Sequence, residues 1–131
     1  ENVMSIIKLK NRSIGEGCTP YVIAEIGVNH EGSMSKAKEL IDMISLAGGH
    51  AAKFQTYKAD KLAAKDSPAY WDTSEEPTMS QYKLFQKYDS FDIGDYHELA
   101  EYCSTKGVDF ISTPFDSDAV EQLAPIMDVY K

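Results

Sequence analysis

Residues 21–32 read YVIAEIGVNHEG. The segment 21–25 is apolar until it ends in the carboxylate of Glu25, as expected of a strand that is buried in a parallel sheet. Two glycines, Gly27 and Gly32, then frame a polar segment that is typical of a turn. A buried strand that becomes polar at its carboxyl end and runs into a turn predicts the first unit of an α/β fold.

The residues after this turn predict a helix and a second strand. Ser33 can cap the helix, and apolar residues then recur at the spacing of one helical face. These residues are Ala37, Leu40, Ile41, Ile44 and Ala47. The pair Gly48-Gly49 can end the helix, and residues 50–55 follow as a short strand.

The alternation of helix and strand continues along the chain. The predicted elements are helices at 80–88, 92–107 and 119–124 and strands at 109–112 and 128–131. Strands that alternate with helices predict a parallel sheet with right-handed connections. A doubly wound sheet and a barrel both fit this order, but the first strand is not followed by the GxGxxG loop of dinucleotide-binding folds.

Two segments fall outside this alternation. Residues 8–14 predict a short β-hairpin with Asn11 and Arg12 at its turn. Residues 56–79 are irregular, and a loop of this length in a compact domain is usually functional or mobile. Trp71 is expected to anchor this loop, although an aromatic side chain here could also stack on a sugar.

The composition narrows the classes of partner. The net charge of −8 over 131 residues argues against nucleic acid or an anionic membrane as the main partner. No apolar run approaches the roughly 18 residues of a membrane span. Cys18 and Cys103 fit neither CxxC nor CxxH, so we expect reduced thiols in a cytoplasmic protein and no zinc site. His30 has no second histidine or cysteine at ligand spacing, and no metal site is predicted within this chain.

Each predicted strand is apolar until its carboxyl end and polar there. The polar side chains at these ends are Glu25, Lys53, Gln55, Thr113 and Lys131. In α/β barrels the active site lies at this face, and Lys53 and Gln55, two residues apart, can share the inner side. Taken singly, each has an ordinary explanation, such as a solvated carboxylate or a lysine that snorkels to the surface. Taken together, four polar strand ends with opposite charges predict a binding site.

These segments resemble, in order, the motifs of the N-acetylneuraminate (sialic acid) synthase family. The matching segments are 10–15, 22–32, 53–56, 110–115 and 129–131. Any one of them is moderately specific, whereas the ordered set is highly specific and covers nearly the whole chain. The resemblance implies an α/β fold that is the N-terminal half of a (β/α)8 TIM-type barrel, with a short N-terminal β-hairpin.

The resemblance also implies a reaction. Members of the family condense phosphoenolpyruvate with an N-acetylated amino sugar, commonly N-acetylmannosamine, to give a sialic-acid-type nonulosonic acid and phosphate. A divalent metal, Mn²⁺ or Mg²⁺, polarises the sugar aldehyde in these enzymes, and its ligands come from later parts of those proteins. A homodimer is implied as well.

Residue roles follow from the matching motifs. Glu25 corresponds to the catalytic carboxylate of the family. Lys53, Thr113 and Lys131 correspond to residues that bind phosphoenolpyruvate, and Gln55 corresponds to a sugar contact. These roles suit the chemistry, because a trianionic substrate needs fixed cations and a nearby carboxylate can handle protons or stabilise a cationic species.

The length of the chain departs from the family. A complete barrel needs about 250 residues, and family members add a C-terminal antifreeze-like domain. We therefore expect residues 1–131 to be a partial barrel of three to four βα units, inactive alone and part of a longer enzyme. Two alternatives stay open: another phosphoenolpyruvate-dependent synthase of 3-deoxy sugar acids, and a non-catalytic half-barrel for binding or assembly.

Overall fold

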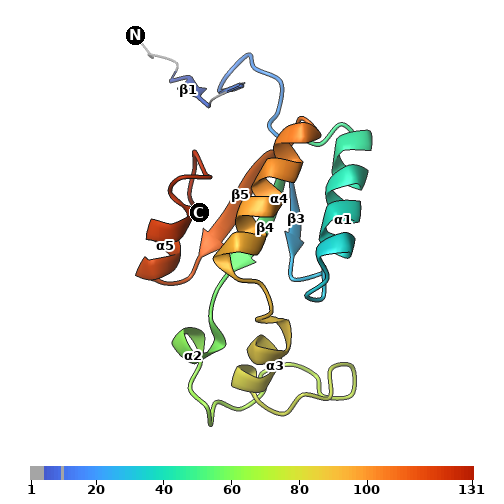
Figure 1. The fold of residues 1–131 in the computed structure, drawn as a ribbon, viewed down its shortest axis with the longest axis vertical. Coiled ribbons are helices and arrows are strands. Elements are labelled where there is room, and N and C mark those ends of the chain that lie inside the picture. Colours follow the sequence, from blue (N-terminus) through green and yellow to red (C-terminus); the bar gives the residue numbers. More distant parts are fainter. Residues whose placement is uncertain (1–4, 10) are drawn as a thin grey trace.

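A three-stranded parallel sheet forms the centre of the molecule. The computed structural model describes residues 5–9 and 11–131. The sheet contains β3 (Ile23–Gly27), β4 (Ala51–Thr56) and β5 (Asp109–Pro114), in the order β3-β4-β5. The order of these strands in space is thus their order in the chain (Figure 1). This arrangement confirms the predicted parallel α/β fold. Consecutive strands of a barrel have this order, and so do the first three strands of a Rossmann sheet.

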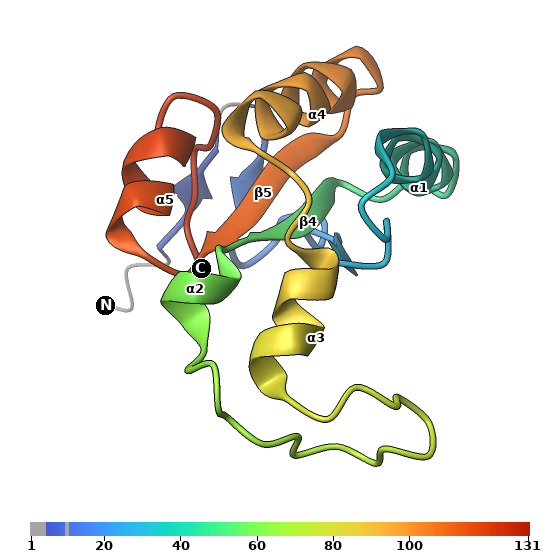
Figure 2. The same ribbon diagram turned by 60° about the horizontal axis from the view of Figure 1, so that its bottom comes forward.

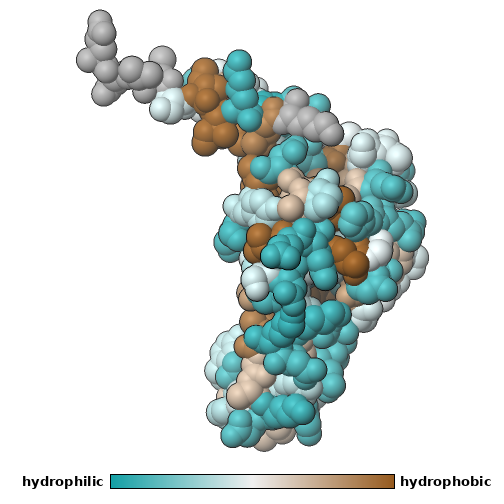
Figure 3. All heavy atoms as spheres, turned by 60° about the vertical axis from the view of Figure 1, so that its left-hand side comes forward, coloured by the Kyte–Doolittle hydropathy of each residue, from teal (hydrophilic) through white to brown (hydrophobic). Residues whose placement is uncertain are grey.

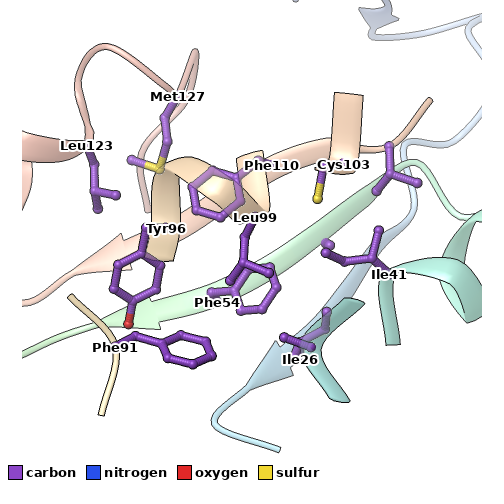
Figure 4. Packing of buried hydrophobic residues seen from close by; sticks show 13 residues of the cluster. Ile26, Ile41, Phe54, Phe91, Tyr96, Leu99, Cys103, Phe110, Leu123 and Met127 are labelled. Carbon is purple, nitrogen blue, oxygen red and sulfur yellow. The ribbon is translucent and has the colours of Figure 1, made fainter. Parts of the chain in front are cut away.

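Three helices cover one face of this sheet. They are α1 (Met34–Leu46), α4 (Ile93–Thr105) and α5 (Ser117–Leu123), and Figure 2 shows α4 over the sheet with α1 and α5 on either side. The hydrophobic core lies between these layers, and Phe54 and Leu99 are fully buried in it (Figure 4). The opposite face of the sheet, which we call the open face, is covered by none of these three helices.

The helix boundaries follow the capping signals in the sequence. The Ser33 side chain accepts a hydrogen bond from the Lys36 N–H at the start of α1. Asp92 and Asp95 form a capping box at the start of α4, which satisfies two backbone donors. Gly48, just beyond α1, has φ of +77°, a conformation that glycine adopts without strain.

A two-stranded hairpin precedes the sheet and confirms the prediction for residues 8–14. Its antiparallel strands are β1 (Ile7–Lys8) and β2 (Ser13–Ile14). The Leu9 N–H donates to the Arg12 carbonyl at 2.7 Å and closes the turn. Lys10, which belongs to the predicted hairpin, lies outside the described residues. The hairpin lies at the amino ends of the sheet strands (Figure 1).

Apolar side chains remain exposed at the hairpin end of the molecule, where Figure 3 shows them in brown. Ile6 and Ile7 on the hairpin are 52% and 59% exposed. Ile23 and Tyr130, which line one cavity with hairpin residues, are also exposed. Large exposed apolar patches are typical of contacts with protein, membrane or ligand.

A lobe formed by residues 57–92 extends beyond the carboxyl ends of the strands (Figure 1). It contains α2 (Ala59–Leu62), which was not predicted, and α3 (Gln81–Tyr88), which was. Asp89 closes the lobe, because its carboxylate accepts bonds from Lys58 Nζ at 2.7 Å and from the Ala59 N–H at 2.9 Å. The Trp71 indole donates to a backbone carbonyl within the lobe at 3.1 Å, as expected of a loop anchor.

The fourth strand that we expected at residues 128–131 does not form. The structure describes all four residues and assigns them no regular element. At the edge of β5, the Ser112 backbone N–H donates instead to the Met127 sulfur at 3.0 Å. A side chain thus takes a donor that a neighbouring strand could have used.

The two cysteines are not paired with each other, as expected. Cys18 and Cys103 are both free thiols. Burial raises the pKa of the Cys103 thiol to about 12, so this residue acts as an apolar core side chain. Within the described parts of the chain, no helix combines the length and the apolar character that crossing a bilayer requires.

Candidate active site on the open face of the sheet

The open face of the sheet carries the polar side chains predicted from the strand ends. Residues alternate between the two faces of a strand, and Phe54 packs in the core on the helix side, so Lys53 and Gln55 lie on the open side. β3 and β4 are in register at Glu25 and Lys53, and β4 and β5 are in register at Gln55 and Thr113. Four predicted residues therefore occupy two neighbouring rows of one face.

An ion pair joins the first of these rows. Glu25 Oε2 lies 2.5 Å from Lys53 Nζ, and the Lys53 side chain is only 15% exposed. A lysine side chain with so little exposure is stabilised when its ammonium group has an anionic partner. The Lys53 ammonium group is therefore held in an ion pair on the sheet rather than standing alone at the surface. Its partner is the strand-end carboxylate that the sequence had placed on the neighbouring strand.

Glu25 and Lys53 line a cavity of about 350 Å³ together with Lys131. The apolar part of its wall is formed by Leu9, Ile14, Ile23, Ile111 and Val129. Lys131 lines this cavity although residues 128–131 form no strand. Three of the five predicted residues thus meet at one cavity, whereas Gln55 and Thr113 lie further along the strands and outside this lining.

Gly27 lies between the Glu25 and Gln55 side chains, and it was not among the predicted site residues. A bulge shifts the strand register between Glu25 and Gly27, and Gly27 has φ of +58°. A Cβ atom at this position would lie 3.3 Å from Glu25 Oε1 and 3.6 Å from Gln55 Nε2. The glycine therefore leaves the carboxylate and the amide room beside each other.

Hydrogen bonds on the helix side fix the strand ends that carry Gln55 and Thr113. The hydroxyls of Thr56 and Ser112 form a buried hydrogen bond of 2.7 Å between β4 and β5. The Tyr96 hydroxyl donates to the Gln55 carbonyl at 2.9 Å. Burial raises the pKa of Tyr96 to about 12, so this hydroxyl stays a donor at neutral pH.

His30 belongs to the core and not to the open face. It is 1% exposed, and its ring stacks on Phe91 with the centroids 4.2 Å apart. Its Nδ1 accepts the Gly32 N–H at 3.0 Å, and burial lowers its pKa, which favours the neutral ring. Within residues 5–9 and 11–131, no group of three His, Cys, Asp or Glu side chains is placed to hold a metal ion.

Another cavity, of about 390 Å³, lies at the amino ends of the strands. The polar residues of its wall include Arg12, Tyr21, Asp109 and Asp128. The Tyr21 hydroxyl donates to Asp109 Oδ2 at 2.7 Å, and Arg12 Nε lies 4.0 Å from the same oxygen. Two carboxylates beside one guanidinium make this cavity less suited to an anion than the cavity that two lysines line.

The open-face site is suited to a small anionic molecule. Ammonium groups bind phosphate and carboxylate through charge-assisted hydrogen bonds, and two of them line the cavity here. The single carboxylate can accept a proton or face a developing positive charge. The Gln55 amide and the Thr113 hydroxyl add neutral hydrogen-bonding groups further along the same face.

Known proteins resemble this chain over most of its length. A family model described as the NeuB family matches residues 40–131. The chain is 34% identical to the N,N'-diacetyllegionaminic acid synthase of Legionella pneumophila over 111 residues. The matched region is 83% of this chain and 31% of that protein. It is 32% identical to the spore coat polysaccharide biosynthesis protein SpsE of Bacillus subtilis over 120 residues. The matched region is 92% of this chain and 32% of that protein.

A solved structure resembles this fold closely. The N-acetylneuraminic acid (sialic acid) synthetase from Leptospira borgpetersenii, in complex with citrate, superimposes with a TM-score of 0.79 and 26% sequence identity. The match covers 99% of this chain and 42% of that chain. The strands and helices described above therefore form part of a (β/α)8 barrel. The chain spans about a third of the length of the curated relatives that it matches.

Proposed function

This chain belongs to the NeuB family, and on that basis we propose that it supplies the phosphoenolpyruvate-binding part of a sialic-acid-synthase-type transferase. In the proposed reaction, C3 of phosphoenolpyruvate attacks the aldehyde carbon of an N-acetylated amino sugar. Water then adds at C2, and phosphate leaves the tetrahedral intermediate. The product is a nonulosonic acid of the sialic acid type. The names of the Legionella synthase and the Leptospira synthetase support this class of reaction.

The observation that carries the proposal is the meeting of Glu25, Lys53 and Lys131 at one cavity. Phosphoenolpyruvate carries a phosphate and a carboxylate, and two ammonium groups can hold both through charge-assisted hydrogen bonds. We assign this task to Lys53 and Lys131. Thr113 is assigned to the same substrate as a neutral donor, since it lies on the adjacent strand of the same face.

Glu25 is the proposed catalytic carboxylate, and Gln55 is the proposed sugar contact. Attack by C3 leaves positive charge at C2, and a carboxylate beside the bound substrate stabilises it. The same group can take the proton of the water that adds at C2. Gln55 lies two residues beyond Lys53 on the same strand face, so a sugar bound there would meet the substrate that the lysines hold.

The divalent metal implied by the sequence resemblance finds no ligand group in the part of the chain that the structure describes. The ring of His30 is buried, and its Nδ1 already accepts a backbone N–H. Mn²⁺ and Mg²⁺ favour oxygen-rich sites with several ligands, which these residues do not fit. No step of the proposed reaction is therefore assigned to a metal held by this chain.

Calorimetric titration with phosphoenolpyruvate tests the proposal. Lys53→Met removes the ammonium group and keeps an apolar side chain. The loss of one charge-assisted contact costs about 1.5–3 kcal/mol, so binding should weaken by about ten- to a hundredfold. Lys58→Met is the matched control, because Lys58 pairs with Asp89 in the lobe, and it should change the affinity by less than about twofold. Equal affinities for the two variants, or no binding to the unaltered chain, would contradict the proposal.

The identity of the second substrate is tested by turnover in the enzyme that contains this chain. Phosphate release from phosphoenolpyruvate should require an N-acetylated amino sugar. Release with simple phosphorylated aldoses instead would favour a synthase of 3-deoxy sugar acids. Binding of phosphoenolpyruvate without release in the presence of any sugar would favour a non-catalytic module.

A further inference from the structure

The structure pairs two groups that the proposed reaction assigns to different tasks. Lys53 is assigned to the phosphate or carboxylate of phosphoenolpyruvate, and Glu25 to the reacting centre, yet Glu25 Oε2 lies 2.5 Å from Lys53 Nζ. Only 15% of the Lys53 side chain is exposed, and its ammonium group already contacts the Glu25 carboxylate. An anionic substrate that reaches this ammonium must therefore meet the carboxylate already bound to it.

The two members of the pair differ in their freedom to move. Anions that share one ammonium group repel each other, and the repulsion is strong where water screens it poorly. Glu25 is 45% exposed, whereas Lys53 is enclosed between its neighbours in the sheet. The carboxylate is therefore the group that gives way when a phosphate arrives.

Gly27 and Gln55 provide the place to which the carboxylate can turn. The Cβ position of Gly27 is 3.3 Å from Glu25 Oε1 and 3.6 Å from Gln55 Nε2, so no side chain stands between the carboxylate and the amide. The Gln55 amide offers two N–H donors to a carboxylate. A turn in this direction moves Glu25 along the sheet, away from the lysine and towards the proposed sugar contact.

We infer that the Glu25–Lys53 ion pair is exchanged when the substrate binds: phosphoenolpyruvate displaces Glu25 from Lys53, and the released carboxylate turns to Gln55. The identity of the displacing anion rests on the proposed function. Through this exchange, occupation of the lysine by phosphoenolpyruvate frees the carboxylate from its ion pair, so that it can act at the reacting centre. Lys53 thus keeps a counter-ion in both arrangements, as a largely buried lysine requires.

Nuclear magnetic resonance on the whole chain tests the exchange directly. The scalar coupling between Lys53 Nζ and Glu25 Cδ reports the hydrogen bond between them. It should vanish at saturating phosphoenolpyruvate, and the side-chain amide signals of Gln55 should move. The pair of Lys38 and Glu98, also at 2.5 Å but between helices α1 and α4, is the matched control and should keep its coupling.

Affinity gives a second test. Glu25→Gln removes the competing carboxylate and should tighten phosphoenolpyruvate binding by about three- to tenfold, the equivalent of a partly exposed ion pair. Glu31→Gln removes a charge from a pair with Lys36 at 2.9 Å in the following loop, and it should leave the affinity within about twofold.

The outcomes separate the inference from the function on which it rests. A coupling that persists at saturation, or an unchanged or weaker affinity in Glu25→Gln, overturns the exchange. If Lys53→Met still loses phosphoenolpyruvate binding in that case, the proposed function stands. If the unaltered chain binds no phosphoenolpyruvate, the proposed function and the exchange both fail.

Discussion

Replacement of Gly27 by alanine tests whether the turn after β3 serves the site as well as the fold. Gly27 has φ of +58° and Gly48 has φ of +77°, and a Cβ in this left-handed region costs roughly 1–2 kcal/mol. Gly27→Ala and Gly48→Ala should each lower the free energy of unfolding by about that amount. The two positions differ in surroundings, because a Cβ at Gly27 meets Glu25 Oε1 at 3.3 Å whereas a Cβ at Gly48 meets nothing within 4 Å.

Only Gly27→Ala should therefore affect the site. Its methyl group would occupy the space through which Glu25 turns to Gln55, so phosphoenolpyruvate binding should weaken by about two- to fivefold, equivalent to roughly 0.4–1 kcal/mol. Gly48→Ala should bind as the unaltered chain does. Urea unfolding gives the stability of both variants, and calorimetry gives their affinity. The reasoning is refuted if both variants lose the same affinity, or if Gly27→Ala costs no stability.

Two further predictions concern the buried polar groups. Ser112→Ala should lower the free energy of unfolding by about 1–3 kcal/mol, because it leaves the Thr56 hydroxyl buried without its partner. In urea titrations the double variant Ser112→Ala/Thr56→Val should lose less than the sum of the two single variants, and additive losses would contradict the coupling. Stability should also fall as the pH drops below about 6.5, since burial lowers the pKa of His30 and the unfolded chain then binds the proton more readily. His30→Gln should flatten this dependence below about pH 6.5, and an unchanged slope would show that other groups cause it.

Local signals explain why most of the fold could be predicted from the sequence. Ser33 and Asp92 each bond to a backbone N–H three residues later, so a helix start depends on a few adjacent residues. The alternation of a strand likewise requires no partner to place Lys53 and Gln55 on one face. The strand patterns alone do not distinguish a barrel from a doubly wound sheet. The prediction of a barrel came from the order of the motifs that resemble the family.

Contacts between distant segments explain what could not be predicted. The Glu25–Lys53 pair depends on the register between β3 and β4 and on the bulge before Gly27, and neither leaves a pattern in the sequence. The prediction of a strand at 128–131 was wrong because a strand also needs an available edge, and Met127 takes a donor on the edge of β5. Residue patterns describe what a segment favours and not what its neighbours leave free.

The location of phosphoenolpyruvate on this chain tests the central claim most directly. Backbone amide shifts, recorded while phosphoenolpyruvate is added, report which of the two cavities it enters. We predict that the largest saturable changes occur at Glu25, Lys53 and Lys131, which line the cavity on the open face. The claim that phosphoenolpyruvate binds on the open face would be contradicted by either of two results. One is that the largest changes occur at Arg12 and Asp109, in the cavity at the amino ends of the strands, and the other is that no change is saturable.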